Sequence, residues 1–243
     1  MKILLTNDDG IHAPGLEALF GVLEPEHEVW IVAPDKQRSG VSHAITMQHP
    51  GKIKKIGEHR YSCSGTPVDC VILSGLGAVP FVPDIVISGI NQGPNLGTDI
   101  IFSGTCGAAR QAALGGLPGI AVSCARYSEP FIYDAAAAFV AQNIEKLSAA
   151  CDPGVFININ APSSTDRNLS AVWVKPGKNR YLDQLTSFTA PDGYTYHFLA
   201  GGGHEICEEA DCDHRTVAEG RIAVSPILVN PQVPSGFIPG RLF

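Results

Sequence analysis

The stretch Met1-Lys-Ile-Leu-Leu-Thr-Asn-Asp-Asp-Gly10 opens the chain and carries most of the fold prediction. Its apolar run is typical of a buried strand, and Asp8, Asp9 and Gly10 follow where that strand would end. In open α/β sheets, ligands bind just beyond the carboxyl ends of the strands. Two neighbouring carboxylates at such a place are unfavourable unless a cation or a proton neutralises them. The stretch therefore predicts a bound divalent cation and, with it, phosphate chemistry.

Strand-like and helix-like segments alternate along the first two thirds of the chain. The expected strands are residues 2–8, 28–33, 84–88, 119–124 and 155–160, and the expected helices are residues 13–24, 66–73, 103–114 and 133–150. Short strands or a hairpin are also expected within residues 43–62, where apolar and polar residues alternate. This order predicts an α/β fold of three layers, in which helices cover both faces of a doubly wound, mostly parallel sheet.

The pattern changes after residue 160, where Gly, Pro and polar residues become more frequent. Strand-like pieces appear at residues 171–175, 194–199 and 221–229. We therefore expect residues 1–160 to form the catalytic core and residues 161–243 to form a β-rich C-terminal extension with a hairpin. The extension is too irregular for a second large core, so it should pack on the first part or exchange with a partner subunit.

Composition excludes several classes of protein. The chain has 243 residues and a net charge of -7, which argues against a nucleic-acid binder with a basic face. Charged residues make up 17%, below the usual level of about 25%, which indicates extensive burial or a subunit interface. No stretch is long enough to span a bilayer, and no signal peptide is evident, so we expect a cytoplasmic protein.

The seven cysteines include no CxxC pair, which favours free thiols in a reducing compartment. One group could bind zinc, and it contains Cys207, Cys212, Glu208, Glu209, Asp211, His204 and His214. Its spacing is irregular, so a solvated acidic loop is the favoured interpretation.

The segment from Ser88 to Thr105 is the richest in ligand-binding features. Three glycines and two asparagines follow its strand, namely Gly89, Gly93, Gly97, Asn91 and Asn95. Glycines let backbone N–H groups approach a ligand, and asparagine carbonyls suit Mg²⁺ or Mn²⁺. Ser103, Gly104 and Thr105 then open a helix whose N–H groups, hydroxyls and dipole could cradle a phosphate. A flexible loop before a capped helix would explain Ser103, but not this concentration of Gly and Asn.

Three weaker features accompany this segment. Arg38-Ser39-Gly40 offers a hydroxyl and a guanidinium, but by itself it is typical of an ordinary polar loop. His12 and His43 follow segments expected at the ligand-binding end of the sheet, so either could act as an acid or base. A hydrogen-bonded structural role is favoured for both histidines.

Taken together, these motifs resemble the SurE survival-protein family of metal-dependent 5'-nucleotidases. The resemblance is carried by residues 6–15, Arg38-Ser-Gly40, Gly65-Thr-Pro-Val-Asp-Cys70, residues 88–97 and Phe102-Ser-Gly-Thr-Cys-Gly-Ala-Ala109, and more loosely by Val217-Ala-Glu-Gly-Arg-Ile-Ala-Val-Ser-Pro226. It implies a Rossmann-like core and a homodimer or homotetramer in which the C-terminal extension is exchanged. It also implies hydrolysis of nucleoside monophosphates, with 3'-nucleotides and short polyphosphates as further substrates.

The resemblance assigns roles to eight residues of this chain. It implies one divalent cation per subunit, Mg²⁺ or Mn²⁺, with Asp8, Asp9, Ser39 and Asn91 as ligands. It implies phosphate contacts by Asn95, Ser103, Gly104 and Thr105. The chain departs from the family at Phe102, Gln111 and Arg221, where a tyrosine, a glutamate and an aromatic residue are usual.

The resulting hypothesis is a phosphomonoesterase in which a metal-activated water attacks phosphorus and Asp8 or Asp9 takes the proton. A nucleotide-binding regulatory module that uses the same pocket without turnover is the alternative from another class. A metal-dependent hydrolase of amide or acyl bonds is a third option, but it would be expected to use zinc and histidine ligands. Neither nucleic acid nor a membrane is expected as a partner.

Overall fold

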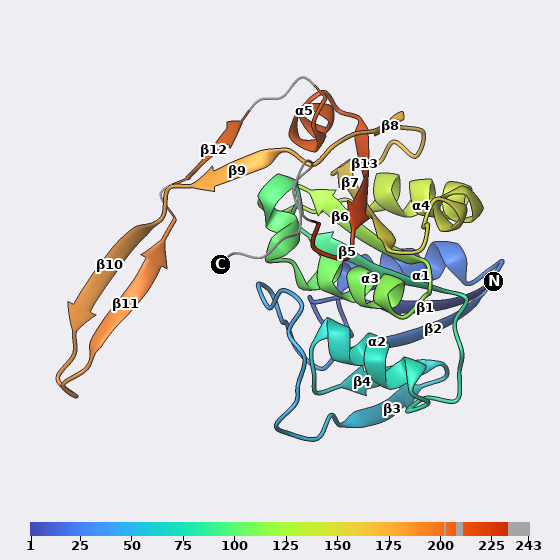
Figure 1. Ribbon diagram of the computed structural model, residues 1–243, viewed down its shortest axis with the longest axis horizontal. Helices are drawn as coiled ribbons and strands as arrows, with labels where there is room; N and C mark the ends of the chain where they lie inside the picture. Colours follow the sequence, from blue (N-terminus) through green and yellow to red (C-terminus); the bar gives the residue numbers. More distant parts are fainter. Residues whose placement is uncertain (202, 208–210, 233–243) are drawn as a thin grey trace, which may run out of the picture.

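A computed structural model describes residues 1–201, 203–207 and 211–232 of the chain. It contains a nine-stranded sheet with the order β3-β4-β2-β1-β5-β6-β7-β13-β8 and helices on both faces (Figure 1). The strands are β1 (Lys2–Thr6), β2 (Glu28–Pro34), β3 (Ile53–Gly57), β4 (Arg60–Cys63), β5 (Ile85–Gln92), β6 (Gly119–Ala125), β7 (Val155–Pro162), β8 (Ala171–Trp173) and β13 (Ile222–Leu228). The helices are α1 (Pro14–Leu23), α2 (Pro67–Gly75), the 3-10 helix η1 (Gly97–Ile101), α3 (Gly104–Leu114), α4 (Asp134–Ala149) and α5 (Asp213–Ala218).

Six neighbouring strands, from β4 through β2, β1, β5 and β6 to β7, are parallel. In chain order they follow the Rossmann sequence 3-2-1-4-5-6, so the order reverses between β1 and β5. This confirms the predicted doubly wound, mostly parallel α/β fold. The crevice beyond the carboxyl ends of β1 and β5 is the place where such a sheet binds ligands.

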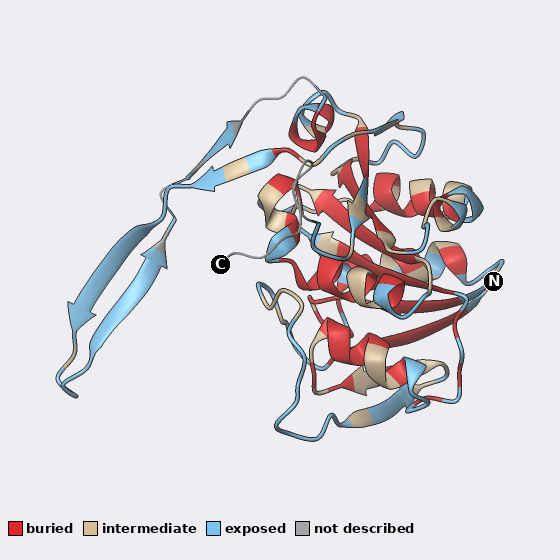
Figure 2. Ribbon diagram, in the orientation of Figure 1, coloured by how far each residue is buried: buried red, intermediate tan, exposed pale blue. Residues whose placement is uncertain are grey.

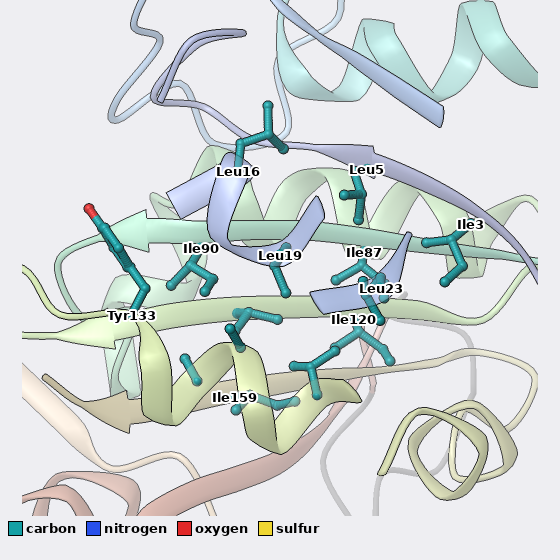
Figure 3. Packing of buried hydrophobic residues seen from close by; sticks show 14 of the residues in the cluster. Ile3, Leu5, Leu16, Leu19, Leu23, Ile87, Ile90, Ile120, Tyr133 and Ile159 are labelled. Atoms are coloured by element: carbon teal, nitrogen blue, oxygen red, sulfur yellow. The ribbon is translucent and has the colours of Figure 1, made fainter. Parts of the chain in front are cut away.

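One face of the sheet is covered by α1 and α4. Leu16, Leu19 and Leu23 recur on one side of α1 and lie fully buried against Ile87 and Ile120 of the sheet (Figure 3). Fully burying a leucine side chain stabilises a fold by about 1.5–3 kcal/mol, so this layer fixes α1 in place. The chain between β1 and α1, which holds Asp8 and Asp9, is thereby anchored at both ends.

The opposite face is covered by α2 and α3. Helix α2 begins with a capping box in which Thr66 and Asp69 satisfy each other's backbone N–H groups. Helix α3 buries small residues such as Ala108 and Ala112, which lets it approach the sheet closely. Within the sheet, Gly89 has φ +140°, and a Cβ there would lie 2.3 Å from the Val122 carbonyl oxygen. Only glycine fits at this point of contact between β5 and β6.

The C-terminal part of the chain contributes to the main sheet and to a projecting arm. Strand β13 pairs antiparallel with β7, and β8 pairs with β13. Strands β9 (Lys178–Tyr181) and β12 (His204–Cys207) form a ribbon that leads to the hairpin of β10 (Gln184–Thr189) and β11 (Thr195–Ala200). The hairpin extends away from the body of the molecule and is exposed over most of its length (Figure 2). None of the helices in the described residues is both long enough and apolar enough to cross a lipid bilayer.

The predicted helices and strands were found with shifted ends. The strand expected at residues 84–88 continues to Gln92, so Gly89 and Asn91 lie within β5 and not in a loop. Strand-like pieces expected at residues 171–175, 194–199 and 221–229 correspond to β8, β11 and β13. Five elements are too short and carry too little periodic pattern to be predicted from the sequence, namely η1, β9, β10, β12 and α5.

Candidate metal and phosphate site

Asp8 lies just after β1, where Asn7 closes a turn. The Asn7 side chain donates to the Gly10 carbonyl (2.9 Å) and accepts from the Gly10 N–H (3.1 Å). Asp8 is buried, and its Oδ1 accepts a hydrogen bond from the Thr105 hydroxyl. Burial raises the pKa of Asp8, although the Thr105 hydroxyl and backbone N–H groups of Thr105 and Gly104 act in the opposite direction. A buried carboxyl with this environment requires a proton or a cation.

Asp9 is less buried and lies close to the charge of Asp8. Its Oδ2 accepts a hydrogen bond from the Gln92 N–H at 3.1 Å. Burial and the repulsion from Asp8 raise the pKa of Asp9 to about 6. The two carboxyl groups thus disfavour each other's ionisation, and a divalent cation would remove that conflict.

Asn91 and Ser39 supply neutral oxygens to the same region. The Asn91 side-chain nitrogen donates to the Gly93 carbonyl (2.9 Å), which orients the amide and leaves its oxygen for a ligand. Ser39 is exposed on the loop after β2, and its hydroxyl accepts from Gln37 at 3.1 Å. Carboxylate, hydroxyl and amide oxygens are the donor set that Mg²⁺ and Mn²⁺ prefer, so these residues fit such an ion.

The start of α3 approaches Asp8 very closely. Ser103 is the N-cap, and its hydroxyl accepts the Cys106 N–H at 3.1 Å. A Cβ at Gly104 would lie 3.0 Å from the Asp8 Cβ, so a larger residue there would displace the carboxylate. Thr105 is fully buried. The structure therefore places Gly104 and Thr105 beneath Asp8, and contact between phosphate and these two residues stays a prediction.

Asn95 is fixed by two asparagines of β7. Asn158 and Asn160 donate to the Asn95 carbonyl at 2.8 and 3.0 Å, and Asn160 Oδ1 accepts the Asn95 N–H at 2.8 Å. The Asn95 side-chain nitrogen donates to the Ser123 hydroxyl at 2.8 Å. These bonds hold the loop after β5 against the next two strands, so Asn95 is held rigidly before any ligand binds.

A cavity of about 320 Å³ opens above these residues, at the reversal of strand order between β1 and β5. Five of the predicted site residues line it, namely Asp8, Ser39, Asn91, Asn95 and Ser103. Asp9 lines an adjoining hollow with His12, and Gln92 borders both spaces. The sequence prediction that these segments meet at one edge of the sheet agrees with this arrangement.

His43 lies outside both hollows. One ring nitrogen, Nε2, is 2.9 Å from Gln111 Oε1, and burial lowers the pKa of the ring. This geometry matches the favoured structural role for His43. His12 is exposed beside Asp9, so its role as an acid or base stays a hypothesis.

Asp213 of α5 was not identified from the sequence as part of this region. Its fully buried carboxylate accepts the N–H groups of Gly97 and Gly177, each at 2.8 Å, and lies 3.0 Å from His214 Nδ1. It thereby connects the C-terminal extension to the start of η1, directly after the loop that carries Asn95.

The expectation of a solvated acidic loop is wrong for residues 212–214, which are buried. Cys212, Asp213 and His214 place ligand atoms within 4.8 Å of one another, but three backbone N–H groups and the His214 ring nitrogen Nδ1 already contact the Asp213 oxygens. The cluster is therefore better suited to bracing a loop than to binding zinc. Glu208 and Glu209, which belonged to the zinc hypothesis, lie outside the described residues.

Fold and site together define a doubly wound α/β protein with acidic and asparagine oxygens gathered at the reversal of strand order. The chain belongs to the survival protein SurE family, whose model matches residues 3–183. This confirms the family resemblance predicted from the motifs.

Several relatives are similar over almost the whole chain. The protein named 5'-nucleotidase SurE from Desulfitobacterium hafniense is 44% identical, over 93% of this chain and 90% of its own length. The protein of the same name from Heliobacterium modesticaldum is 40% identical, over 93% of this chain and 86% of its own length. The crystal structure of the SurE protein from Aquifex aeolicus superposes with a TM-score of 0.81 at 32% identity, covering 96% of this chain and 95% of that one.

Proposed function

We propose that the protein is a divalent-metal-dependent 5'-nucleotidase that hydrolyses nucleoside monophosphates to nucleoside and phosphate. The observation that carries this proposal is the gathering of Asp8, Ser39, Asn91, Asn95 and Ser103 around one cavity. Relatives named 5'-nucleotidase SurE, at about 40% identity over nearly the full chain, support it. The proposal includes 3'-nucleotides and short polyphosphates as further substrates.

Asp8, Asp9, Ser39 and Asn91 would hold one Mg²⁺ or Mn²⁺ ion per subunit. When bound, such an ion would offset the charge of the phosphate and lower the pKa of a water molecule. The hydroxyl of Ser103 and the amide of Asn95 would orient phosphate oxygens at the inner end of the cavity. Thr105 and Gly104 would act through Asp8, because they contact that carboxyl group directly.

Of the two carboxylates, we propose Asp9 as the group that takes a proton from the attacking water. Asp8 is buried and held by the Thr105 hydroxyl, whereas Asp9 borders an open hollow and has one hydrogen bond, from Gln92 N–H, in this structure. A base must reach both the water and the solvent that finally receives the proton. The greater solvent access of Asp9 supports its assignment to that step.

The test is phosphate release from AMP by the purified protein, with EDTA and with added Mn²⁺. We expect EDTA to abolish release and Mn²⁺ to restore it, and Asp8→Asn to abolish release at every metal concentration. Asp152→Asn is the matched control. Asp152 is exposed just before β7, at the amino ends of the parallel strands, whereas the site lies at their carboxyl ends. Release that resists EDTA or survives Asp8→Asn would reject the proposed function.

The same experiment separates the enzyme from a nucleotide-binding module. A module would bind AMP in the cavity and release no phosphate under any metal. Zinc-dependent cleavage of amide or acyl bonds is disfavoured, because the cavity is lined by no histidine in the described part of the chain.

We also propose that the protein is a homodimer or homotetramer in which residues 161–243 are exchanged between subunits. The support is the projecting hairpin, where Phe188 stacks on Tyr196 and Phe198 at ring distances of 5.3 and 5.9 Å. A two-stranded hairpin is only marginally stable alone, so a row of aromatic side chains on it favours packing against a partner subunit.

A chain ending at residue 160 should be unstable or monomeric by light scattering, also because β7 would lose its neighbouring strand β13. A truncated chain that stays folded and dimeric would reject the exchange.

Composition supports a proposal for the cellular location of the protein and for the partners that it is not expected to bind. The six cysteines whose side chains the structure describes are free thiols, which fits a reducing compartment, and we propose the cytoplasm. With a net charge of -7, neither nucleic acid nor an anionic membrane surface is proposed as a partner.

A further inference from the structure

The outer part of the cavity is lined by aromatic rings. Phe102, Tyr127 and Tyr181 are 52%, 69% and 42% exposed, although aromatic residues make up only 7% of the chain. They come from three separate segments, the turn before α3, the loop after β6 and strand β9 of the extension. Three exposed rings at the mouth of one cavity indicate a surface for a flat, apolar ligand group.

Asp99 holds part of this aromatic group in position. The Tyr181 hydroxyl donates to Asp99 Oδ1, which also accepts from Asn179 Nδ2 at 3.1 Å. The rings of Phe102 and Tyr181 meet edge to face, with centroids 6.3 Å apart and planes at 74°. Burial and the Asp99 carboxylate raise the pKa of Tyr181 to about 12, so its ring stays neutral under assay conditions. Asp99 is thus engaged by the protein's own groups.

The position of the rings relative to the phosphate end determines what they can touch. Asp8, Asn95 and Ser103 are buried at the inner end of the cavity, so the leaving group of a bound phosphate ester must extend outward. Phe102 lines the same cavity as Ser103, and its exposed ring is accessible to a leaving group that extends outward. Arg126 lines the same space and adds a positive charge suited to an anionic substrate.

We propose that Phe102, Tyr127 and Tyr181 form the subsite for the base of a nucleoside monophosphate, and that they bind it by stacking. The inference rests on the proposed function and adds how the leaving group is recognised. Every nucleobase has an aromatic face, so stacking tolerates all four bases. Asp99 Oδ1, at the outer end, already accepts from Tyr181 and Asn179, so this oxygen supports the ring of Tyr181.

Product inhibition tests the subsite directly, with AMP as substrate and Mn²⁺ present. Adenosine, one product, contains the base but no phosphate. Inorganic phosphate, the other product, contains no base. Phe102→Ala and Tyr127→Ala should each raise the inhibition constant of adenosine at least about five-fold, the lower end of measured base stacking, and leave that of phosphate unchanged. Phe102→Tyr and Tyr127→Phe should restore adenosine binding, since they keep the rings.

A second comparison uses ribose 5-phosphate, which lacks the base. The KM for AMP should rise in the alanine variants, whereas the kinetic constants for ribose 5-phosphate should change by less than about two-fold. Trp173→Ala is the control, because it removes an exposed ring of β8 away from the cavity. It should change the kinetic constants for neither AMP nor ribose 5-phosphate. For the unmodified protein, kcat/KM values for AMP, GMP, CMP and UMP should lie within about ten-fold of one another.

Failure of this inference is distinguishable from failure of the proposed function. If the unmodified protein hydrolyses AMP with Mn²⁺ but the alanine variants leave the adenosine inhibition constant unchanged, the stacking subsite is rejected and the nucleotidase stands. Equal losses for AMP and ribose 5-phosphate would also reject it, because they indicate displaced phosphate ligands. If the unmodified protein releases no phosphate from AMP with any metal, the proposed function itself is rejected.

Discussion

Replacing Asp9 by asparagine should stabilise the metal-free protein while it removes metal-dependent activity. Asp9 Oδ2 accepts the Gln92 N–H at 3.1 Å, and an asparagine oxygen can accept the same bond. The substitution therefore mainly removes a negative charge beside Asp8. Loss of function with a gain in stability is the signature of a residue retained for its chemistry and not for folding.

The expected gain follows from the pKa of Asp9, which burial and the charge of Asp8 raise from 3.8 to about 6. At about 1.36 kcal/mol per pH unit, the ionised carboxylate costs the folded protein up to roughly 3 kcal/mol. Below pH 3.8 the carboxyl is protonated in both the folded and the unfolded states, so the cost is absent. It grows as pH rises from 3.8 and is complete above pH 6. The gain in stability from Asp9→Asn should therefore grow between pH 3.8 and 6 and be complete above pH 6.

Urea unfolding of EDTA-treated protein on both sides of that range measures the effect. The unfolding midpoint of the variant should exceed that of the unmodified protein above pH 6 and equal it below pH 3.8. Added Mn²⁺ should raise the midpoint of the unmodified protein and leave that of the variant in place. Asp152→Asn serves again as the control. The reasoning would be refuted if the variant were less stable than the unmodified protein above pH 6. It would also be refuted if the unfolding midpoints of the two proteins differed by the same amount above pH 6 and below pH 3.8.

Two further substitutions test contacts around the site. Thr105→Val removes the hydroxyl that donates to Asp8 and should weaken Mn²⁺ binding by about 10- to 100-fold in calorimetry, whereas Thr105→Ser should not; equal affinities in the two variants would contradict this role. Asp213→Ala removes the acceptor of the Gly97 N–H and should cost about 1–3 kcal/mol in urea unfolding, with a raised KM for AMP. Unchanged stability and KM would show that the extension does not brace the loop.

Part of the candidate site could be predicted from local sequence. An apolar run that ends in Asn7-Asp8-Asp9-Gly10 indicates a strand followed by a turn, because each signal lies within a few neighbouring residues. The same holds for Ser103 as the cap of α3, and for the alternation of strands and helices that implies a doubly wound sheet.

Other features of the site depend on contacts between distant segments. Thr105 and Asp8 are 97 positions apart, and Asp213 and Gly97 are 116 apart. No local pattern encodes such pairs, so neither the bond between Thr105 and Asp8 nor a role for Asp213 was predicted from the sequence. The asparagines of β7 that hold Asn95 went unnoticed for the same reason, since inside an apolar strand they have no evident partner.

By itself the sequence determined most of the core elements and the family, and it predicted which residues bind a cation and a phosphate, because periodicity, turn chemistry and short motifs are local. Only the tertiary structure decided which side chains meet. It placed Asp8 and Asp9 in adjoining hollows and gathered three aromatic rings around the mouth of one of them. The physical reason is that the register of the sheet and the packing of helices on it set these distances, and both are properties of the whole fold.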